Sequence, residues 1–437
     1  MTIRNNCVEN IANVLIIYKQ MAADVRVFRR RGWNIPAIWS IFHAGKGGYD
    51  MKKILIIAAV LTAALVVCAG PVREIRFEGD RNVLLCDGVE SGFRECVREQ
   101  LRLHPSMRAE DVLKLCFQAA CGPAHILGHT EAAKRSFDAE FSAVAPRPKA
   151  PLYEVISPDF VRVDLGAWKA ANLPPEWLFR MFYASARKFG DADAVLKKYL
   201  AIAEEELDGG RKTRFAALRK NAARAPHHSP AYRTAEAPSY RVVSIRFLNA
   251  LPVLRLAAAL PEKPVRVVAI DGRAASGKTT LARQLALILN AGVVHMDDFF
   301  LPPALRTPQR YAEPGGNVHY ERFIREVLPR VGRPEPFSYR VFDCSRMDYG
   351  GCSEVGGAGW RVVEGAYSLH PKFGDYADLK VFYDISPAEQ MRRIKLRNGE
   401  RGARMFRERW IPLEEAYIRN CDPIRRADLT VGGGTLR

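Results

Sequence analysis

The fold is decided by residues 265–300, VRVVAIDGRAASGKTTLARQLALILNAGVVHMDDFF. This stretch opens with an apolar run at residues 265–270, rich in β-branched side chains and short enough for a buried strand. Residues 272–279, GRAASGKT, then fit the pattern G-x-x-x-x-G-K-[ST] at every position. Apolar side chains recur at helical spacing after the loop, and residues 290–292, NAG, end that pattern. We therefore expect a strand, a glycine-rich loop and a helix in succession.

This succession predicts a site for the phosphates of a nucleoside triphosphate. Glycines at 272 and 277 allow tight turns that bring backbone N–H groups onto phosphate oxygens, and the helix N-terminus adds partial positive charge. Lys278 would reach the β- and γ-phosphates of ATP, and Thr279 would offer its hydroxyl to Mg²⁺. The expected nucleotide contacts are Gly272, Ala275, Ser276, Gly277, Lys278, Thr279 and Thr280.

Two carboxylates, Asp297 and Asp298, follow the next short apolar run at residues 292–296. Parallel α/β sheets bind ligands at the carboxyl ends of their strands, so these acids are expected beside the phosphates. A carboxylate there can accept the proton of a substrate hydroxyl that attacks the γ-phosphate. The alternatives are that both acids cap a helix or only bind Mg²⁺, and we assign Asp298 to the metal.

Three further strands are predicted at residues 360–363, 379–385 and 427–431. With the first two they predict a parallel five-stranded sheet in an α/β domain. The run at 360–363 ends at Glu364, an acid that can hold the Mg²⁺ shell or a substrate hydroxyl.

Two segments are predicted to cover the site. Residues 301–346 are rich in proline, glycine and aromatic residues and predict a substrate-covering insertion with a helix at 320–328. Residues 387–397 predict a basic helix in which Arg393 and Arg397 can close over the phosphates. The alternative for this helix is a solvated basic face.

A mainly helical domain of unknown function is expected at residues 107–255, ahead of a domain at 256–437. In it, His125 and His129 are four residues apart, which suits a metal pair or, more simply, a structural or capping role. Residues 227–243, HHSPAYRTAEAPSYRVV, predict an anion-binding or recognition loop, or else a polar linker on the surface.

Residues 1–106 form an extension that is hard to place. Residues 51–70, MKKILIIAAVLTAALVVCAG, resemble a secretory signal peptide and are short for a membrane span. The run can be a membrane anchor, a buried helix, or a sign that the stated start is upstream of the true one. We favour the third explanation, in which residues 1–106 are partly or wholly spurious, because a clean helical pattern opens at Met107.

Composition indicates an ordinary globular protein of 437 residues, with 48% hydrophobic and 26% charged residues. The net charge of +18 suits acidic ligands such as nucleotides, and also RNA or an anionic membrane surface. Because the basic residues are spread along the chain without a nucleic-acid motif, we expect no nucleic-acid partner. Nine cysteines without a C-x-x-C pair favour reduced thiols in the cytoplasm.

Residues 265–431 resemble the uridine kinase and phosphoribulokinase family of P-loop kinases. The resemblance is carried by GRAASGKTT, VVHMDDFF, PGGNVHYERF, VVEGAY, DLKVFYDI, RRIKLRNGERG and ADLTV. The chain departs from the family's D-x-F-Y at Phe300, which stands where the family usually has tyrosine. The segment that contacts the nucleoside is matched only loosely.

The resemblance implies ATP-dependent phosphoryl transfer to an alcohol, with Mg²⁺. It implies that Lys278 and Thr279 serve the phosphates and the metal, that Asp297 is the general base, and that Glu364 is linked to Mg²⁺ or substrate. It also implies that Arg393 and Arg397 belong to a lid.

We therefore expect a cytoplasmic kinase of a small hydroxyl substrate, most simply a nucleoside, with pantothenate or a sugar phosphate as alternatives. A second class is a nucleotide-binding regulatory module without turnover, although an N-K-x-D guanine signature is missing from the sequence. A third hypothesis gives the helical domain its own binding or catalytic role. Oligomer formation stays open, and a membrane contact is expected only if residues 51–70 are a true anchor.

Overall fold

The computed structural model describes residues 73–78, 81–86, 89–90, 92–125, 130–186, 192–222, 225–357, 359–432 and 435–436. These residues lie in one compact unit, Pro71–Arg437. The apolar run at 51–70 and His129 lie outside the described residues. Within the described ranges, no helix is both long and apolar enough to cross a membrane.

A five-stranded parallel sheet forms the centre of the C-terminal half, in the order β13-β12-β7-β11-β8. Its strands are β7 (Arg266–Gly272), β8 (Gly292–His295), β11 (Trp360–Glu364), β12 (Leu379–Asp384) and β13 (Leu429–Gly432). The predicted parallel sheet is confirmed, with each predicted strand end within two residues of the observed one. β7 is the central strand and is almost wholly buried, which explains its continuous apolar run.

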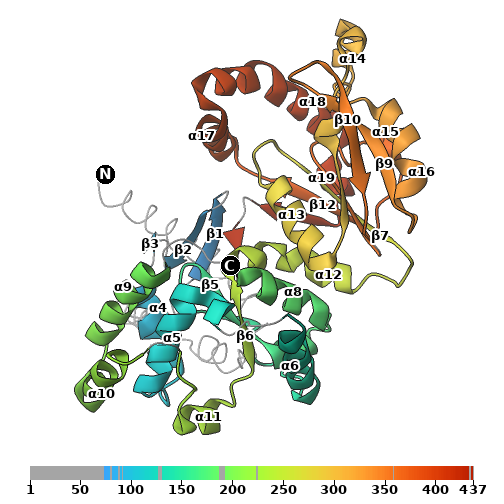
Figure 1. Ribbon diagram of the computed structural model, residues 1–437. Helices are drawn as coiled ribbons and strands as arrows, with labels where there is room; N and C mark the ends of the chain where they lie inside the picture. The colour runs from blue at the N-terminus through green and yellow to red at the C-terminus, as the bar shows by residue number, and fades with distance from the viewer. Residues whose placement is uncertain are drawn as a thin grey trace, which may run out of the picture. The chain divides into compact units, whose positions relative to one another are not determined.

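Helix α13 (Lys278–Leu289) follows β7 directly, as the sequence predicted (Figure 1). Leu281, Leu285 and Ile288 are fully buried on its inner face. The helix ends at Asn290, whose φ of 56° is the left-handed conformation expected of a helix stop. The loop between β7 and α13 is therefore held between two buried elements.

The segment after β8 contains η3 (Met296–Phe299), η4 (Pro303–Leu305), α14 (Pro308–Ala312), α15 (Tyr320–Glu326), α16 (Leu328–Val331) and the strands β9 (Phe337–Asp343) and β10 (Asp348–Val355). The helix predicted at 320–328 is confirmed as α15. The two strands form an antiparallel hairpin, which was not predicted. Phe299, Phe323 and Tyr339 join these elements in one aromatic cluster.

The C-terminal helices are α17 (Pro387–Met405), a π-helical turn η6 (Phe406–Trp410), α18 (Ile411–Cys421) and α19 (Pro423–Arg426), with η5 (Pro371–Phe373) before β12. Helix α17 bends at Gly399, where φ is 67° and ψ is −179°. Figure 1 shows the bent course of α17 and its continuation into α18. The predicted basic helix at 387–397 is the first part of α17.

The N-terminal half contains α4 (Phe93–Leu103), α5 (Ala109–Cys121), η1 (Gly122–His125), α6 (Thr130–Ala143), α7 (Leu165–Ala170), α8 (Pro175–Ser185), α9 (Ala192–Glu205), α10 (Gly209–Arg219), α11 (Pro230–Glu236), η2 (Ile245–Ala250) and α12 (Leu251–Ala258). It also contains an antiparallel sheet of β4 (Tyr153–Val155), β5 (Phe160–Asp164) and β6 (Tyr240–Ser244). A second antiparallel sheet pairs β1 (Arg73–Glu78), β2 (Arg81–Cys86) and β3 (Val89–Glu90) with β14 (Thr435–Leu436). The described residues of this region are mainly helical, and its strands are too short for their side chains to show a clear alternation in the sequence.

The hydrophobic core runs through the boundaries expected at residues 107 and 255. Phe93 and Val97 of α4 are buried in the same cluster as Leu113 of α5. That cluster continues into Val268 and Leu285 of the parallel sheet and its helix. Helix α4 therefore folds with the rest of the unit, although it lies before Met107.

His104 gives the N-terminal half a pH-dependent contribution to stability. Its ring nitrogens lie 2.9 Å from Glu154 Oε2 and 3.0 Å from Glu236 Oε2. Burial alone lowers the pKa of His104, but the hydrogen bonds and charges of the two carboxylates outweigh burial and raise it. A histidine with a raised folded pKa stabilises the protein fully below the unfolded pKa of about 6.5, and this stabilisation disappears as the pH rises through the folded pKa.

We expect His104→Gln to lower the free energy of unfolding more at about pH 5.5 than at about pH 9, by roughly 1 kcal/mol or more. Urea unfolding across this pH range measures the difference, with the exposed His227→Gln as the matched control. A loss of stability that is the same at every pH would show that the ion pairs of His104 contribute nothing.

Candidate active site

The loop between β7 and α13, residues 272–277 (the glycine loop), has the backbone conformation that the sequence predicted. Gly272, Ala275 and Gly277 have φ values of 141°, 58° and 110°. The amide of Arg273 donates to the Tyr383 carbonyl at 3.2 Å, which ties the loop to the end of β12. The loop therefore curls tightly at the carboxyl edge of the sheet.

Gly272 is the position where the loop has least room. A Cβ atom there would lie 2.2 Å from the Tyr383 carbonyl oxygen, and alanine would also be strained at a φ of 141°. We expect Gly272→Ala to lower the free energy of unfolding by about 1–3 kcal/mol from backbone strain alone. Thermal unfolding measures this loss, and Gly332→Ala is the matched control because its Cβ meets nothing within 4 Å. Equal stability of the two variants would contradict this account of the loop.

Lys278 and Ser276 provide polar groups at the loop. The Lys278 ammonium donates to the Arg273 carbonyl at 2.7 Å, and the side chain is only 8% exposed. Ser276 is buried, and its hydroxyl has no hydrogen-bond partner among the described residues. The Lys278 ammonium and the Ser276 hydroxyl are both buried beside the curled loop. Two such donors fit the phosphate groups of a nucleotide.

Thr279 and Glu364 meet at the carboxyl end of β11. The Thr279 hydroxyl donates to Glu364 Oε2 at 3.3 Å, and Glu364 is only 5% exposed. The other carboxylate oxygen, Oε1, lies 2.6 Å from His295 Nδ1. This hydrogen bond raises the pKa of His295. The structure thus brings together two predicted residues and adds His295, which the sequence analysis missed. Thr280 lies beside them, partly buried on the first turn of α13.

Asp297 and Asp298 are the second and third residues of η3, which directly follows β8. Asp297 is partly open to solvent, but desolvation by the surrounding protein raises the pKa of its carboxyl, and the charge of Glu364 raises it further. Asp298 Oδ2 accepts a hydrogen bond from the Tyr339 hydroxyl at 2.8 Å. Asp297 is therefore open to a substrate, whereas one oxygen of Asp298 is held by strand β9.

The two predicted lid arginines are placed differently. Arg393 donates to the Ser276 carbonyl at 3.3 Å and to Glu389 Oε1 at 2.7 Å, so it contacts the glycine loop. Arg397 is exposed one turn further along α17, where it donates to Asn398 Oδ1 at 2.8 Å. The structure therefore brings Arg393, and not Arg397, to the loop.

Two buried acids that the sequence analysis missed support the loop. Asp271, the penultimate residue of β7, accepts hydrogen bonds from the amides of Tyr367 and Leu369 and from the Tyr417 hydroxyl, at 3.0, 2.9 and 2.7 Å. Glu414 of α18 accepts a hydrogen bond from the Ala274 amide at 2.6 Å. Burial raises the pKa of both carboxyls. The sequence signal for Asp271 was an acid that follows the apolar run of residues 265–270 and directly precedes Gly272.

The protein ligands available to the expected Mg²⁺ ion are oxygen atoms. Among the described residues, no group of three or more His, Cys, Asp or Glu side chains could hold a metal ion. Mg²⁺ in nucleotide sites usually takes one or two protein oxygens together with phosphate oxygens and water. The Thr279 hydroxyl and the Glu364 carboxylate fit that pattern without a dedicated cage.

The N-terminal half reaches the glycine loop through Asn249 of η2. The Tyr383 hydroxyl donates to Asn249 Oδ1, and Asn249 Nδ2 lies 3.4 Å from Gln284 Oε1 on α13. Tyr383 also supplies the carbonyl that holds the start of the loop, and its ring faces Gly277. Asn249, Gln284 and Tyr383 are all buried.

We expect Asn249→Ala to leave the Tyr383 hydroxyl unpaired and to lower the free energy of unfolding by about 1–3 kcal/mol. Because Tyr383 holds the loop, the dissociation constant of ATP should also rise. Thermal unfolding and ATP titration measure the two effects, with the exposed Asn221→Ala as control. Unchanged ATP affinity in a destabilised variant would show that Asn249 has no part in shaping the loop.

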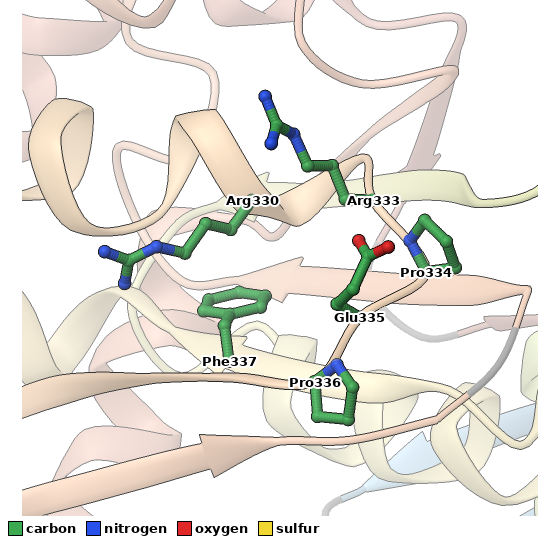
Figure 2. A pocket seen from close by; sticks show the side chains of 6 residues that line it. All are labelled: Arg330, Arg333, Pro334, Glu335, Pro336 and Phe337. Carbon is green, nitrogen blue, oxygen red and sulfur yellow. The ribbon is translucent and has the colours of Figure 1, made fainter.

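A separate pocket lies at the opposite edge of the parallel sheet. It has a volume of about 400 Å³ and is lined by Arg330, Arg333, Pro334, Glu335, Pro336 and Phe337 (Figure 2). Arg361, near the start of β11, donates to the carbonyls of Arg333 and Glu335, both at 3.3 Å. None of the predicted site residues lines it. Since α/β sheets bind ligands at the carboxyl ends of strands, this pocket is not the candidate active site.

Part of the chain is similar to solved structures of kinases. No protein-family model matches the chain, and no curated protein matches it. A possible uridine kinase from Bacillus stearothermophilus is 20% identical, with a TM-score of 0.34, over 42% of this chain and 96% of that one. A candidate fructose transport system kinase from a Silicibacter species is 24% identical, with a TM-score of 0.34, over 42% and 98%. The D-glycerate 3-kinase from Cryptococcus neoformans is 16% identical, with a TM-score of 0.28, over 39% and 85%. At these TM-scores the similarities fix neither the activity nor the substrate of the chain.

Proposed function

We propose that the protein transfers the γ-phosphoryl group of ATP to a hydroxyl of a small molecule, with a nucleoside as the favoured acceptor. One observation carries this proposal: Lys278 and Thr279 directly follow a curled glycine loop, and the Thr279 hydroxyl donates a hydrogen bond to the buried Glu364. The exposed Asp297 lies on the next strand end, where a substrate hydroxyl can reach it. Donors for phosphate and a candidate base therefore share one edge of the sheet.

Each residue has a distinct role in this proposal. The amides of residues 272–280, the Ser276 hydroxyl and the Lys278 ammonium hold the phosphates. Thr279 and Glu364 would hold Mg²⁺, whose positive charge would stabilise the phosphoryl oxygens when ATP is bound. Asp298 is a further candidate for the metal shell, through the oxygen that Tyr339 does not hold.

Asp297 orients the acceptor hydroxyl and takes its proton. Its raised pKa makes the carboxylate a stronger base than an ordinary aspartate. Arg393 is positioned to contact the transferring group because it already touches the loop. Arg397 can act only if α17 moves, since it lies one turn beyond Arg393.

Two alternatives to this function can be tested by experiment. Pantothenate or a sugar phosphate can replace the nucleoside, because a hydroxyl is all that the base requires. A regulatory module would bind ATP at the same loop without transferring phosphate, and the exposed Asp297 is the feature that favours an enzyme.

The acceptor is identified by incubating the full chain with MgATP and single compounds from a panel of nucleosides, pantothenate and sugar phosphates. ADP release above the rate without acceptor, for one class of compound, supports the proposal and names the substrate class. Tight binding of ATP with no acceptor-dependent release from any compound would favour the regulatory module.

A further inference from the structure

The N-terminal half contains a polar cluster that the proposed kinase reaction does not use. We call it the Arg162 cluster, and it consists of Asp111, Lys114, Gln118, Arg162, His228 and Tyr240. Its residues come from helix α5, strands β5 and β6, and the segment before α11. Asp111, Lys114 and Gln118 are spaced so that they share one face of α5.

Arg162 is the charged centre of this cluster. Its side chain is 3% exposed, and its guanidinium carbon lies 4.8 Å from the centre of the Tyr240 ring. Arg162 Nε and Nη2 donate to Gln118 Oε1 at 3.0 and 2.8 Å, and Nη1 donates to Gln100 Oε1 at 3.0 Å. Each terminal nitrogen carries two hydrogens, so within the described residues one N–H on each lacks a hydrogen-bond partner.

Neutral amides, and not carboxylates, hold this buried cation. Within the part of the chain that the structure describes, no carboxylate is paired with Arg162 or with Lys114. The half-buried Lys114 donates to the Pro226 carbonyl at 3.2 Å. Burial lowers the pKa of Lys114, and the charge of Arg162 lowers it further.

The acids nearby are already engaged by other groups. Asp111 accepts hydrogen bonds from the Ser229 amide and hydroxyl at 2.9 and 2.6 Å and lies 2.8 Å from His228 Nδ1. Glu154 and Glu236 both contact His104. Burial lowers the pKa of Arg162, but the charges around it, those of Glu154 and Asp111 included, outweigh burial and raise it. A buried guanidinium that no carboxylate contacts directly is still costly, and a second cation nearby adds repulsion.

We propose that the Arg162 cluster binds the anionic group of a small molecule, a phosphate or a carboxylate, between Lys114 and Arg162. An anion there gains charge-assisted hydrogen bonds from both cations and removes their mutual repulsion. The Tyr240 hydroxyl adds a polar group that orients the ligand. Gln118 Nε2 contacts this hydroxyl at 3.1 Å, and His228 Nε2 contacts it as well. Lys114 and Tyr240 are partly exposed, so the cluster is open to solvent on their side.

The test uses the full chain carrying Lys278→Ala, so that the glycine loop does not bind the added anion. Inorganic phosphate and malonate are titrated separately at constant ionic strength, because the net charge of +18 attracts anions non-specifically. Calorimetry and thermal unfolding follow the binding. We expect saturable binding of at least one of the two probes, and the tighter one shows whether the ligand group is a phosphate or a carboxylate.

Two matched variants locate the binding. Lys114→Gln, at a partly exposed position, should weaken the saturable binding by about tenfold, which is the loss of one charge-assisted hydrogen bond. Lys220→Gln removes the same charge from an exposed surface position and should change it by about twofold or less. The proposal is overturned if neither probe binds saturably, or if the two variants weaken binding equally.

Discussion

Replacement of Lys278 by alanine should lower kcat for phosphoryl transfer by about 10²–10³-fold, as removal of one preorganised donor at a developing charge does. The Arg273 carbonyl accepts a hydrogen bond from this ammonium, and the side chain is almost fully buried beside the glycine loop. ADP release with the best acceptor measures the effect.

The control is Lys220→Ala, which removes an exposed lysine and should leave kcat unchanged. Thermal unfolding of both variants separates a loss of the transition-state contact from a loss of folded protein. If folded Lys278→Ala protein kept more than about one tenth of the wild-type rate, the assignment of this lysine to the phosphates would be wrong.

Asp297→Asn should lower kcat by about 10²–10⁴-fold, because the amide cannot accept the proton of the acceptor hydroxyl. The dissociation constant of ATP should change little, since Asp297 belongs to the strand end after β8 and not to the loop. The raised pKa of Asp297 also predicts that activity falls as the pH drops through that value, at a higher pH than for an ordinary aspartate. Steady-state rates between about pH 4 and 8 measure the fall in kcat and its dependence on pH.

The neighbouring Asp298→Asn provides the matched comparison. One oxygen of Asp298 already accepts a hydrogen bond from Tyr339, so its substitution should alter the Mg²⁺ dependence or the stability more than the proton transfer. A larger fall in kcat for Asp298→Asn than for Asp297→Asn would exchange the two roles.

The parts of the site that are local in the chain could be predicted from the sequence. The strand, the glycine loop and helix α13 depend on neighbouring residues, so their periodicity and their glycines are sufficient. The position of Glu364 could be predicted for the same reason, because an acid at the end of a buried strand lies at the edge of the sheet.

The parts that depend on distant contacts could not be predicted. Glu414 reaches the loop amide of Ala274 from a helix 140 residues later, and Asn249 reaches Tyr383 across 134 residues. Neither residue has a pattern in its own neighbourhood that indicates the contact. Arg397 lies one turn beyond Arg393 on α17, and the sequence did not indicate that only Arg393 contacts the loop.

The N-terminal half shows the same limit at the level of secondary structure. Strand β4 has three residues, and β5 and β6 have five each, which is too short for a period of two to be distinct from chance. The segment at 227–243 was predicted as an anion-binding loop or a polar linker. In the structure its His228 and Tyr240 contact one another, and Tyr240 also packs against Arg162.

The most direct test of the proposed function follows the γ-phosphate itself. The full chain is incubated with γ-labelled ATP, Mg²⁺ and the acceptor that best stimulates ADP release, and the products are separated. We predict that the label appears in a phosphate ester of the acceptor, and that the Lys278→Ala and Asp297→Asn chains form little of it. If the label stays in ATP or appears only as inorganic phosphate while ATP binds tightly, the glycine loop serves nucleotide binding without transfer to a small molecule.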